Sequence, residues 1–194
     1  MLLCFYLFVV YLENKKFWVA WLLGLSGYFL ILFEPSPLIT GVVLIGILIR
    51  AIRDGRFSRK DLVQLFINTS FAFLVVYIFF YIFFSFNLFQ SFLYVLKDAR
   101  NFNVAYERGY LIWATVNNKD FFYGVGIPVI IVFIYMTAHI LVETKTLKSV
   151  GEWPLENIFV ISLLVTYFIL LFLGINRGEV IRLWVYLAVL FQVP

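Results

Sequence analysis

The chain has 194 residues, of which 64% are hydrophobic and only 13% are charged. Soluble domains are about 45–50% apolar and about 25% charged, so this composition excludes an ordinary soluble domain, a disordered chain and a coiled coil. Aromatic residues make up 21% of the chain, which suits lipid-facing helices with aromatic belts at the membrane interfaces. The formal net charge is +4, and the bases lie in short loops between apolar runs. This placement indicates membrane topology rather than nucleic-acid binding.

The apolar runs predict an all-α, polytopic transmembrane helical bundle with about six membrane segments. The first run, Met1–Leu12, is short for a span, and the last, Val180–Pro194, ends before it could cross comfortably. We therefore expect one transmembrane domain, residues 1–194, that is a piece of a longer chain. Within it we expect helices and a hairpin over residues 1–86, an outer-face segment over 87–120, and C-terminal helices over 121–194. The intervening spans are Phe17–Phe33, Leu38–Ile49, Leu62–Phe86, Phe121–Val142 and Ile158–Ile175.

Local signals predict where these helices begin, turn and bend. The prolines of Glu34-Pro35-Ser36-Pro37 cannot sit inside a helix, so the chain turns there. Ser58 with Asp61 predicts the N-terminal cap of the span that follows. Asp120 is expected to cap the next span, and Pro128 to kink it.

The segment Asn87–Lys119 mixes aromatic and charged residues, which predicts one or two amphipathic helices at the membrane surface. Alternating the spans divides the loops into two sets. The set with more bases and shorter loops faces the cytoplasm. The amphipathic segment and the segment from Asn176 to Arg182 are then expected on the extracytoplasmic side. The bases of the cytoplasmic set are Lys15, Lys16, Arg50, Arg53, Arg56, Arg59, Lys60, Lys145 and Lys148.

Arginines on the outer side predict an anion site, because the guanidinium fork matches two phosphate oxygens at once. Arg177 and Arg182 flank the start of a predicted helix, whose positive end also attracts an anion. Structural alternatives stay open. Glu179 can complete a capping box with Asn176 or pair with Arg182, and the charges beside Arg108 can belong to a solvated helix face. The chain has no metal-binding motif, no glycine-rich phosphate loop and no nucleophile elbow, so no metal and no cofactor are expected.

Two stretches carry more than composition. The first is Arg108-Gly109-Tyr110 with Trp113, Asn117, Asp120-Phe121, Gly124 and Pro128. The second is Gly174-Ile175-Asn176-Arg177-Gly178-Glu179-Val180 with Arg182-Leu183-Trp184. In this order, and between such spans, they resemble the C-terminal membrane half of bacterial and archaeal GT-C-class glycosyltransferase-like integral membrane proteins.

The resemblance implies transfer of a sugar from a polyprenyl-phosphate-linked donor at the extracytoplasmic face. Arg177, Glu179 and Arg182 would then bind the donor phosphate or position a helix. The outer cleft would be shaped by Tyr106, Glu107, Arg108 and Asp120. The family's catalytic acid lies in the first outer loop of its N-terminal half, and nothing in this chain matches that loop. The catalytic residue is therefore unknown, and whether the chain alone is an enzyme stays open.

The sequence therefore predicts a multi-pass protein of the cell membrane. Its predicted function is to form the lipid-phosphate-binding part of a GT-C-like glycosyltransferase. The expected partners are membrane lipid, a polyprenyl-phosphate-linked sugar and a membrane protein partner, with no nucleic acid. The alternative function is a non-catalytic membrane subunit or scaffold that packs against the helices of a partner.

Overall fold

The computed structural model describes residues 1–107, 109–144, 153–173 and 185–192. These described residues form α-helices and one 3-10 helix joined by turns, with no strand among them, so the all-α prediction is confirmed. The chain divides into two compact units. Unit 1 comprises Met1–Leu38 and Leu48–Val95, and unit 2 comprises Ile39–Ile47 and Leu96–Pro194.

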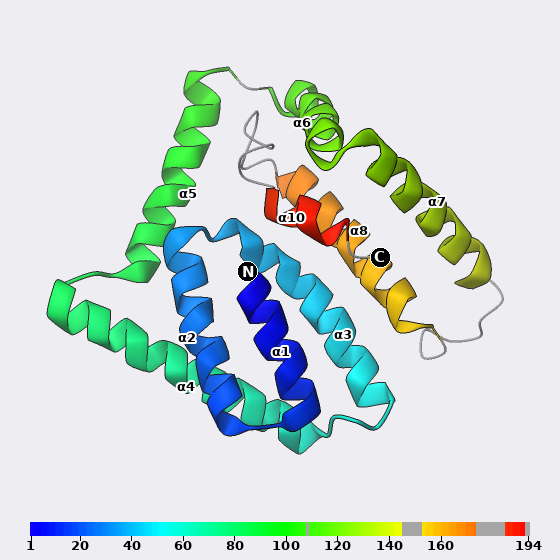
Figure 1. Cartoon of the computed structure of the whole chain (residues 1–194). Helices are drawn as coiled ribbons and strands as arrows, with labels where there is room; N and C mark the ends of the chain where they lie inside the picture. Colours follow the sequence, from blue (N-terminus) through cyan, green and yellow to red (C-terminus); the bar gives the residue numbers. More distant parts are fainter. Residues whose placement is uncertain (108, 145–152, 174–184, 193–194) are drawn as a thin grey trace. The chain divides into compact units, whose positions relative to one another are not determined.

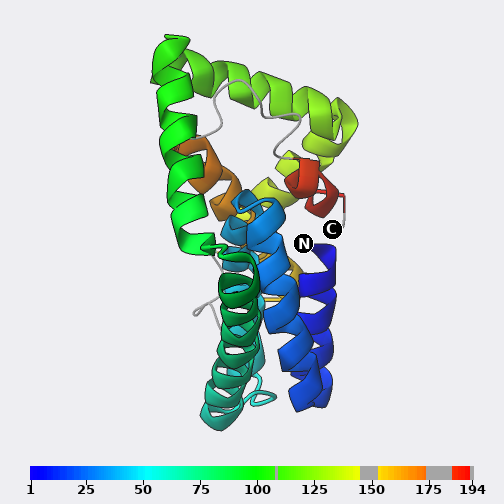
Figure 2. The same cartoon turned by 90° about the vertical axis from the view of Figure 1, so that its left-hand side faces the viewer.

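Unit 1 is built around α2 (Phe17–Phe33), which begins and ends where the sequence predicts. It packs against α1 (Leu2–Asn14) and α4 (Arg59–Phe84), which lie beside it in both views of the ribbon (Figures 1 and 2). The turn from α1 to α2 is tight because Lys15 takes the left-handed conformation, with φ 52°. The prediction that Leu62–Phe86 forms a long helix is confirmed, with the helix beginning three residues earlier.

The first turn of α4 has the predicted cap. The Ser58 hydroxyl accepts a hydrogen bond from the Asp61 N–H at 3.2 Å, and the Asp61 carboxylate accepts one from the Ser58 N–H at 2.8 Å. This reciprocal pair is a capping box, which satisfies two N–H groups that the helix itself leaves without partners.

The proline turn after α2 is held by Glu34. Its carboxylate accepts hydrogen bonds from the N–H and the hydroxyl of Ser36, at 3.2 and 2.7 Å. A 3-10 helix, η1 (Ser36–Thr40), follows and leads into α3 (Gly41–Arg53). The prediction that the chain leaves the helix at these prolines is confirmed.

Unit 2 contains α6 (Tyr110–Val125), which packs against α7 (Ile127–Thr144), α8 (Leu155–Leu173) and α10 (Val185–Leu190). Helices α6 and α7 are bent by 104° relative to each other, and Figure 1 shows the corner between them.

The structure corrects two local predictions at this corner. The bend lies at Gly126, whose φ of 99° few other residues adopt, and not at Pro128. Pro128 lies in the first turn of α7, where its missing N–H has no partner to lose. Asp120 does not cap a helix, because it lies in the interior of α6.

Three helical segments of the described chain are long and apolar enough to cross a membrane, namely Ser36–Arg53, Arg59–Phe84 and Leu155–Leu173. The bent pair Tyr110–Val125 and Ile127–Val142 makes a fourth if it is one broken span. Helices α1 and α2 are apolar but have only 13 and 17 residues. The described part of the chain thus supports three to four spans, and the number of about six stays a prediction.

The predicted surface segment forms α5 (Leu88–Ala105) and α6 as far as Lys119. Its position at a membrane surface stays a prediction. Helix α4 exposes large apolar side chains along its length, including Phe66 at 71%, Ile82 at 65% and Phe83 at 71%. A helix that is apolar on its exposed side is typical of a membrane protein, because lipid replaces the water that would make such exposure costly.

Candidate functional site

The predicted site residues are divided between the described and the undescribed parts of the chain. Arg108, Arg177, Glu179 and Arg182 lie outside the described residues. Tyr106 follows α5, is 64% exposed and has its ring centroid 4.5 Å from that of Phe102. Asp120 is half-buried on α6, directly before Phe121.

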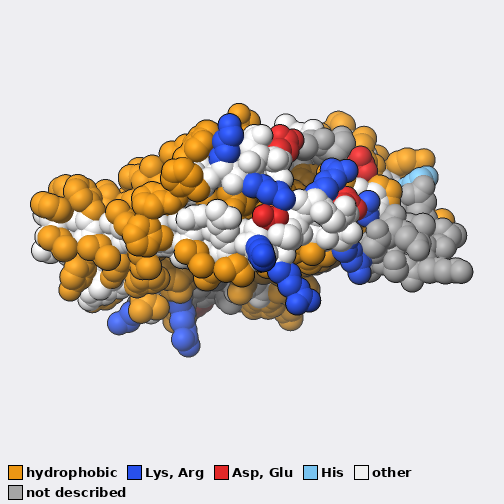
Figure 3. Space-filling model, turned by 90° about the horizontal axis from the view of Figure 1, so that it is seen from below, with side chains coloured by type: hydrophobic (Ala, Val, Ile, Leu, Met, Phe, Trp, Pro, Cys, Tyr) orange, Lys and Arg blue, Asp and Glu red, His pale blue; other side chains and the backbone are white. Residues whose placement is uncertain are grey.

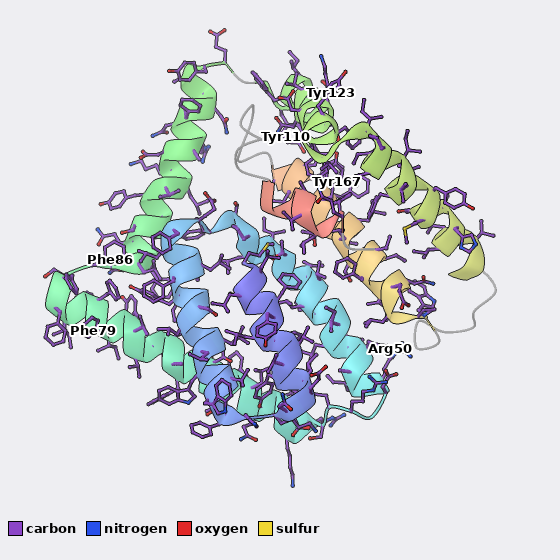
Figure 4. The ribbon with its side chains drawn as sticks, in the orientation of Figure 1. Arg50, Phe79, Phe86, Tyr110, Tyr123 and Tyr167 are labelled. Carbon is purple, nitrogen blue, oxygen red and sulfur yellow. The ribbon has the colours of Figure 1, made fainter. Side chains whose placement is uncertain are left out.

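One hydrogen bond joins the beginning of α6 to the end of α8. The hydroxyl of Tyr110, the first residue of α6, donates to the carbonyl oxygen of Phe172 at 3.0 Å (Figure 4). The two residues are 62 positions apart in the chain. Phe172 accepts in the last turn of α8, where helix carbonyls have no partner within the helix. In the sequence, the first motif begins two positions before Tyr110 and the second begins two positions after Phe172.

A second contact between the same helices lies further along α6. The hydroxyl of Tyr167 on α8 donates to the side-chain carbonyl of Asn118, and the Asn118 amide donates to the Ala114 carbonyl at 2.9 Å. Asn118 thus uses both ends of its amide, which fixes its orientation. The hydrogen bonds from Tyr110 to Phe172 and from Tyr167 to Asn118 thus position α6 on α8.

An apolar cavity of about 330 Å³ lies between α6, α7, α8 and the segment after α10. Its walls are largely aromatic. The ring centroid of Phe121 lies 5.0 Å from that of Tyr167 and 5.3 Å from that of Phe191. The ring centroids of Phe133 and Phe191 are 4.2 Å apart. Thr137 and Ala138 of α7 also line the cavity. The volume falls at the lower end of the range for ligand pockets.

The chemistry of this cavity suits hydrocarbon. Its hydroxyl groups are already engaged, since Tyr167 donates to Asn118 and Thr137 donates to the Phe133 carbonyl at 2.8 Å. An isoprenoid or acyl chain can therefore fill it without leaving a polar group unpaired. Within the ranges that the structure describes, no three His, Cys, Asp or Glu side chains are grouped so that they could hold a metal ion.

Apart from Phe121, which belongs to the first motif, sequence reasoning missed the residues that line the cavity and the pair of Asn118 and Tyr167. The available signal was Tyr167 in the predominantly apolar α8 and two consecutive asparagines in α6, because buried polar groups usually pair. Asn117, the other asparagine, is 2% exposed. The positions of the aromatic rings had no such signal, since aromatic residues occur throughout the chain.

Comparison with known proteins gives no relative for this arrangement. No protein-family model matches the chain, and neither a curated protein nor a solved structure matches it.

Proposed function

We propose that the chain binds a polyprenyl-phosphate-linked sugar at the extracytoplasmic face of the cell membrane, as the lipid-phosphate-binding part of a GT-C-like glycosyltransferase. The observation that carries this proposal is the hydrogen bond from Tyr110 to Phe172. It joins the start of α6 to the end of α8. In the sequence, the two motifs of the resemblance begin next to these helix ends. Residues far apart in the sequence can then serve one ligand.

The cavity supplies the second support, because a lipid-linked donor needs a place for hydrocarbon beside its phosphate. The aromatic walls contributed by Phe121, Tyr167 and Phe191 suit part of an isoprenoid chain. The segment that contains Arg177 and Arg182 connects α8 to α10 in the sequence, and residues of α8 and just after α10 line this cavity.

In the proposed role, the two arginines bind the phosphate of the donor. When the sugar is transferred, the bond between the sugar and the phosphate breaks and negative charge develops on the phosphate oxygen. Guanidinium groups stabilise such charge through charge-assisted hydrogen bonds. Catalysis also needs an acid or base, which this proposal leaves to a part of the protein other than these arginines.

Binding to a defined probe tests the proposal. The purified chain in lipid nanodiscs is titrated with a short-chain polyprenyl phosphate, and binding is followed by tryptophan fluorescence. We expect Arg177→Gln and Arg182→Gln each to weaken binding about tenfold or more, because a hydrogen bond to a charged group contributes about 1.5–3 kcal/mol. Lys97→Gln, which removes an exposed base on α5, should leave the affinity unchanged.

Polyprenol, which lacks the phosphate, is the matched ligand. The natural chain should bind polyprenol more weakly than it binds polyprenyl phosphate. The two arginine variants should bind polyprenol with the same affinity as the natural chain. Equal affinity of the natural chain for polyprenol and polyprenyl phosphate would contradict a phosphate site.

A cavity variant tests the position of the hydrocarbon. Ala138 lines the cavity and is exposed, so Ala138→Trp should fill the cavity without disturbing a buried core. We expect it to weaken binding of both polyprenyl phosphate and polyprenol. Val132→Trp adds the same side chain at an exposed position of α7 outside the cavity and should change neither affinity.

The second candidate is a non-catalytic membrane subunit, for which the exposed apolar side of α4 offers a contact surface. Phe66, Ile82 and Phe83 offer a surface that either lipid or the helix of a partner can cover. If the chain binds no polyprenyl phosphate but purifies from its native membrane in a stable complex with one other membrane protein, this function replaces the first.

A further inference from the structure

Two loops of unit 1 meet at one end of its helices. The turn between α1 and α2 contributes Lys15, whose ammonium group is 2.8 Å from the carboxylate of Asp61 in the first turn of α4. Beneath this ion pair, Phe57 is only 2% exposed, and its ring lies 6.1 Å from that of Tyr11 at an edge-on angle. The contacts join the two loops, so that residues 13–16 and 50–61 form one surface, which we call the basic platform.

Bases outnumber acids on the basic platform, with seven lysines and arginines against three acidic residues. Two of the acids are already paired. Asp61 pairs with Lys15, and Asp54 pairs with Arg50 at 3.1 Å. Arg56 reaches Asp54 only at 4.0 Å, and its side chain is 79% exposed. Four further bases are exposed and have no ion pair with any other described residue, namely Lys16, Arg53, Arg59 and Lys60.

The location of these free charges decides what they can meet. Lys16 directly precedes α2, Arg53 is the last residue of α3, and Arg59 is the first residue of α4. All three therefore lie where an apolar helix begins or ends. In a helix that crosses a bilayer, these ends lie at the depth of the lipid headgroups. Seen from below, lysine and arginine side chains gather on the molecular surface beside a few acidic ones (Figure 3).

We propose that the basic platform binds the phosphate headgroups of anionic phospholipids in the adjoining leaflet. Anionic headgroups match this surface in charge at a fixed depth: the Lys15–Asp61 pair joins the two loops, the Arg50–Asp54 pair occupies a second acid, and the other bases are left for external anions. Each base near an anionic leaflet favours binding by about fivefold. The site belongs to unit 1 and is independent of the proposed polyprenyl-phosphate function, whose residues all lie in unit 2.

Lipid selectivity measured by spin-labelled lipids tests this proposal on the full chain in bilayers. The natural chain should prefer spin-labelled phosphatidylglycerol over phosphatidylcholine by several fold, and 1 M salt should remove most of the preference. The variant Lys16→Gln, Arg53→Gln, Arg59→Gln, Lys60→Gln should lose the preference. The control variant Lys97→Gln, Arg100→Gln, Lys119→Gln removes three exposed bases of α5 and α6 and should keep the preference.

Three results would overturn the proposal. The first is equal association of both lipids with the natural chain, and the second is an unchanged preference in the four-base variant. The third is displacement of phosphatidylglycerol by inorganic phosphate but not by chloride at the same ionic strength, which would identify a site for free phosphate. Helix content by circular dichroism confirms that each variant is folded. Because polyprenyl phosphate binding is measured separately, either proposal can fail without the other.

Discussion

Gly24 of α2 lies so close to the backbone of Thr69 on α4 that a Cβ atom at position 24 would overlap the Thr69 carbonyl oxygen. The same atom would lie 2.9 Å from the Cβ of Ala72. Nearby, the Thr69 hydroxyl donates to the Ala20 carbonyl at 3.3 Å, so the two helices are also hydrogen-bonded at this crossing. Close approach through a glycine is a common way for apolar helices to gain packing energy in a membrane.

Gly24→Ala is therefore expected to destabilise unit 1 by about 1–3 kcal/mol, the usual cost of overpacking a core. The obstacle is a backbone atom, which cannot rotate away, so α2 and α4 must separate. The free energy of unfolding in an SDS titration measures the change. Gly27→Ala is the matched control on the same helix, since a Cβ there meets nothing within 4 Å. It should be neutral or stabilising by up to about 1 kcal/mol, because alanine is the better helix former.

Gly46→Ala tests a contact of a different kind in unit 2. A Cβ at position 46 would overlap the hydroxyl oxygen of Ser162 and lie 3.2 Å from the Cγ2 of Ile158. The hydroxyl can rotate, so we expect a smaller loss than at Gly24, about 1 kcal/mol. Adding Ser162→Ala should restore most of the loss, because it removes the overlapping atom. A double-mutant cycle in the same SDS titration measures this coupling, and additive effects of the two substitutions would contradict the predicted contact.

The sequence was sufficient to predict the parts of the fold that depend on local chemistry. The bounds of α2 follow from an uninterrupted apolar run between a basic turn and two prolines. The capping box of Ser58 and Asp61 follows from spacing alone, because both of its hydrogen bonds form within one turn of the chain. The chain direction changes at Pro35 and Pro37 because proline cannot continue a helix.

The corner between α6 and α7 could not be predicted in this way. The sequence offers both Gly126 and Pro128 as places for a bend, and a proline inside an apolar run is the stronger signal. In the structure, hydrogen bonds of Tyr110 and Asn118 hold α6 on α8. The chain then changes direction into α7 at Gly126, which has the positive φ that glycine permits. These contacts join residues about 50 or more positions apart, which no local pattern encodes.

Tyr110→Phe tests the hydrogen bond that joins the start of α6 to the end of α8. The substitution removes the hydroxyl that donates to the Phe172 carbonyl and keeps the ring, so we expect a loss of about 1 kcal/mol in the stability of unit 2. If the bond also positions the proposed phosphate site, polyprenyl phosphate should bind several fold more weakly, while polyprenol binding should hardly change. Tyr123→Phe is the control, because Tyr123 is an exposed tyrosine on the same helix, 62% exposed. A similar loss of affinity in both variants would contradict a specific role for Tyr110.

Ser58→Ala tests how the basic platform is held. The Ser58 hydroxyl accepts the Asp61 N–H at the start of α4 and donates to the Asp61 carboxylate at 2.9 Å, and Asp61 in turn pairs with Lys15. Loss of an N-cap serine costs about 1 kcal/mol, measurable as a lower free energy of unfolding in the SDS titration. Lys15→Met removes an ion pair whose lysine side chain is 41% exposed, so it should cost less than the cap, because solvent screens exposed pairs.

Ser91→Ala on α5 is the control for Ser58→Ala. It removes a serine hydroxyl that forms no side-chain hydrogen bond with the described residues, so it should change neither the free energy of unfolding nor the lipid preference. Ser58→Ala and Lys15→Met should each also weaken the preference for phosphatidylglycerol, since the α1–α2 turn is then less firmly joined to the α3–α4 loop. Because Ser58→Ala leaves every base of the basic platform in place, its effect on lipid selectivity separates the geometry of the platform from its charge. An unchanged preference would mean that the total charge suffices and that the capped, paired arrangement contributes only to stability.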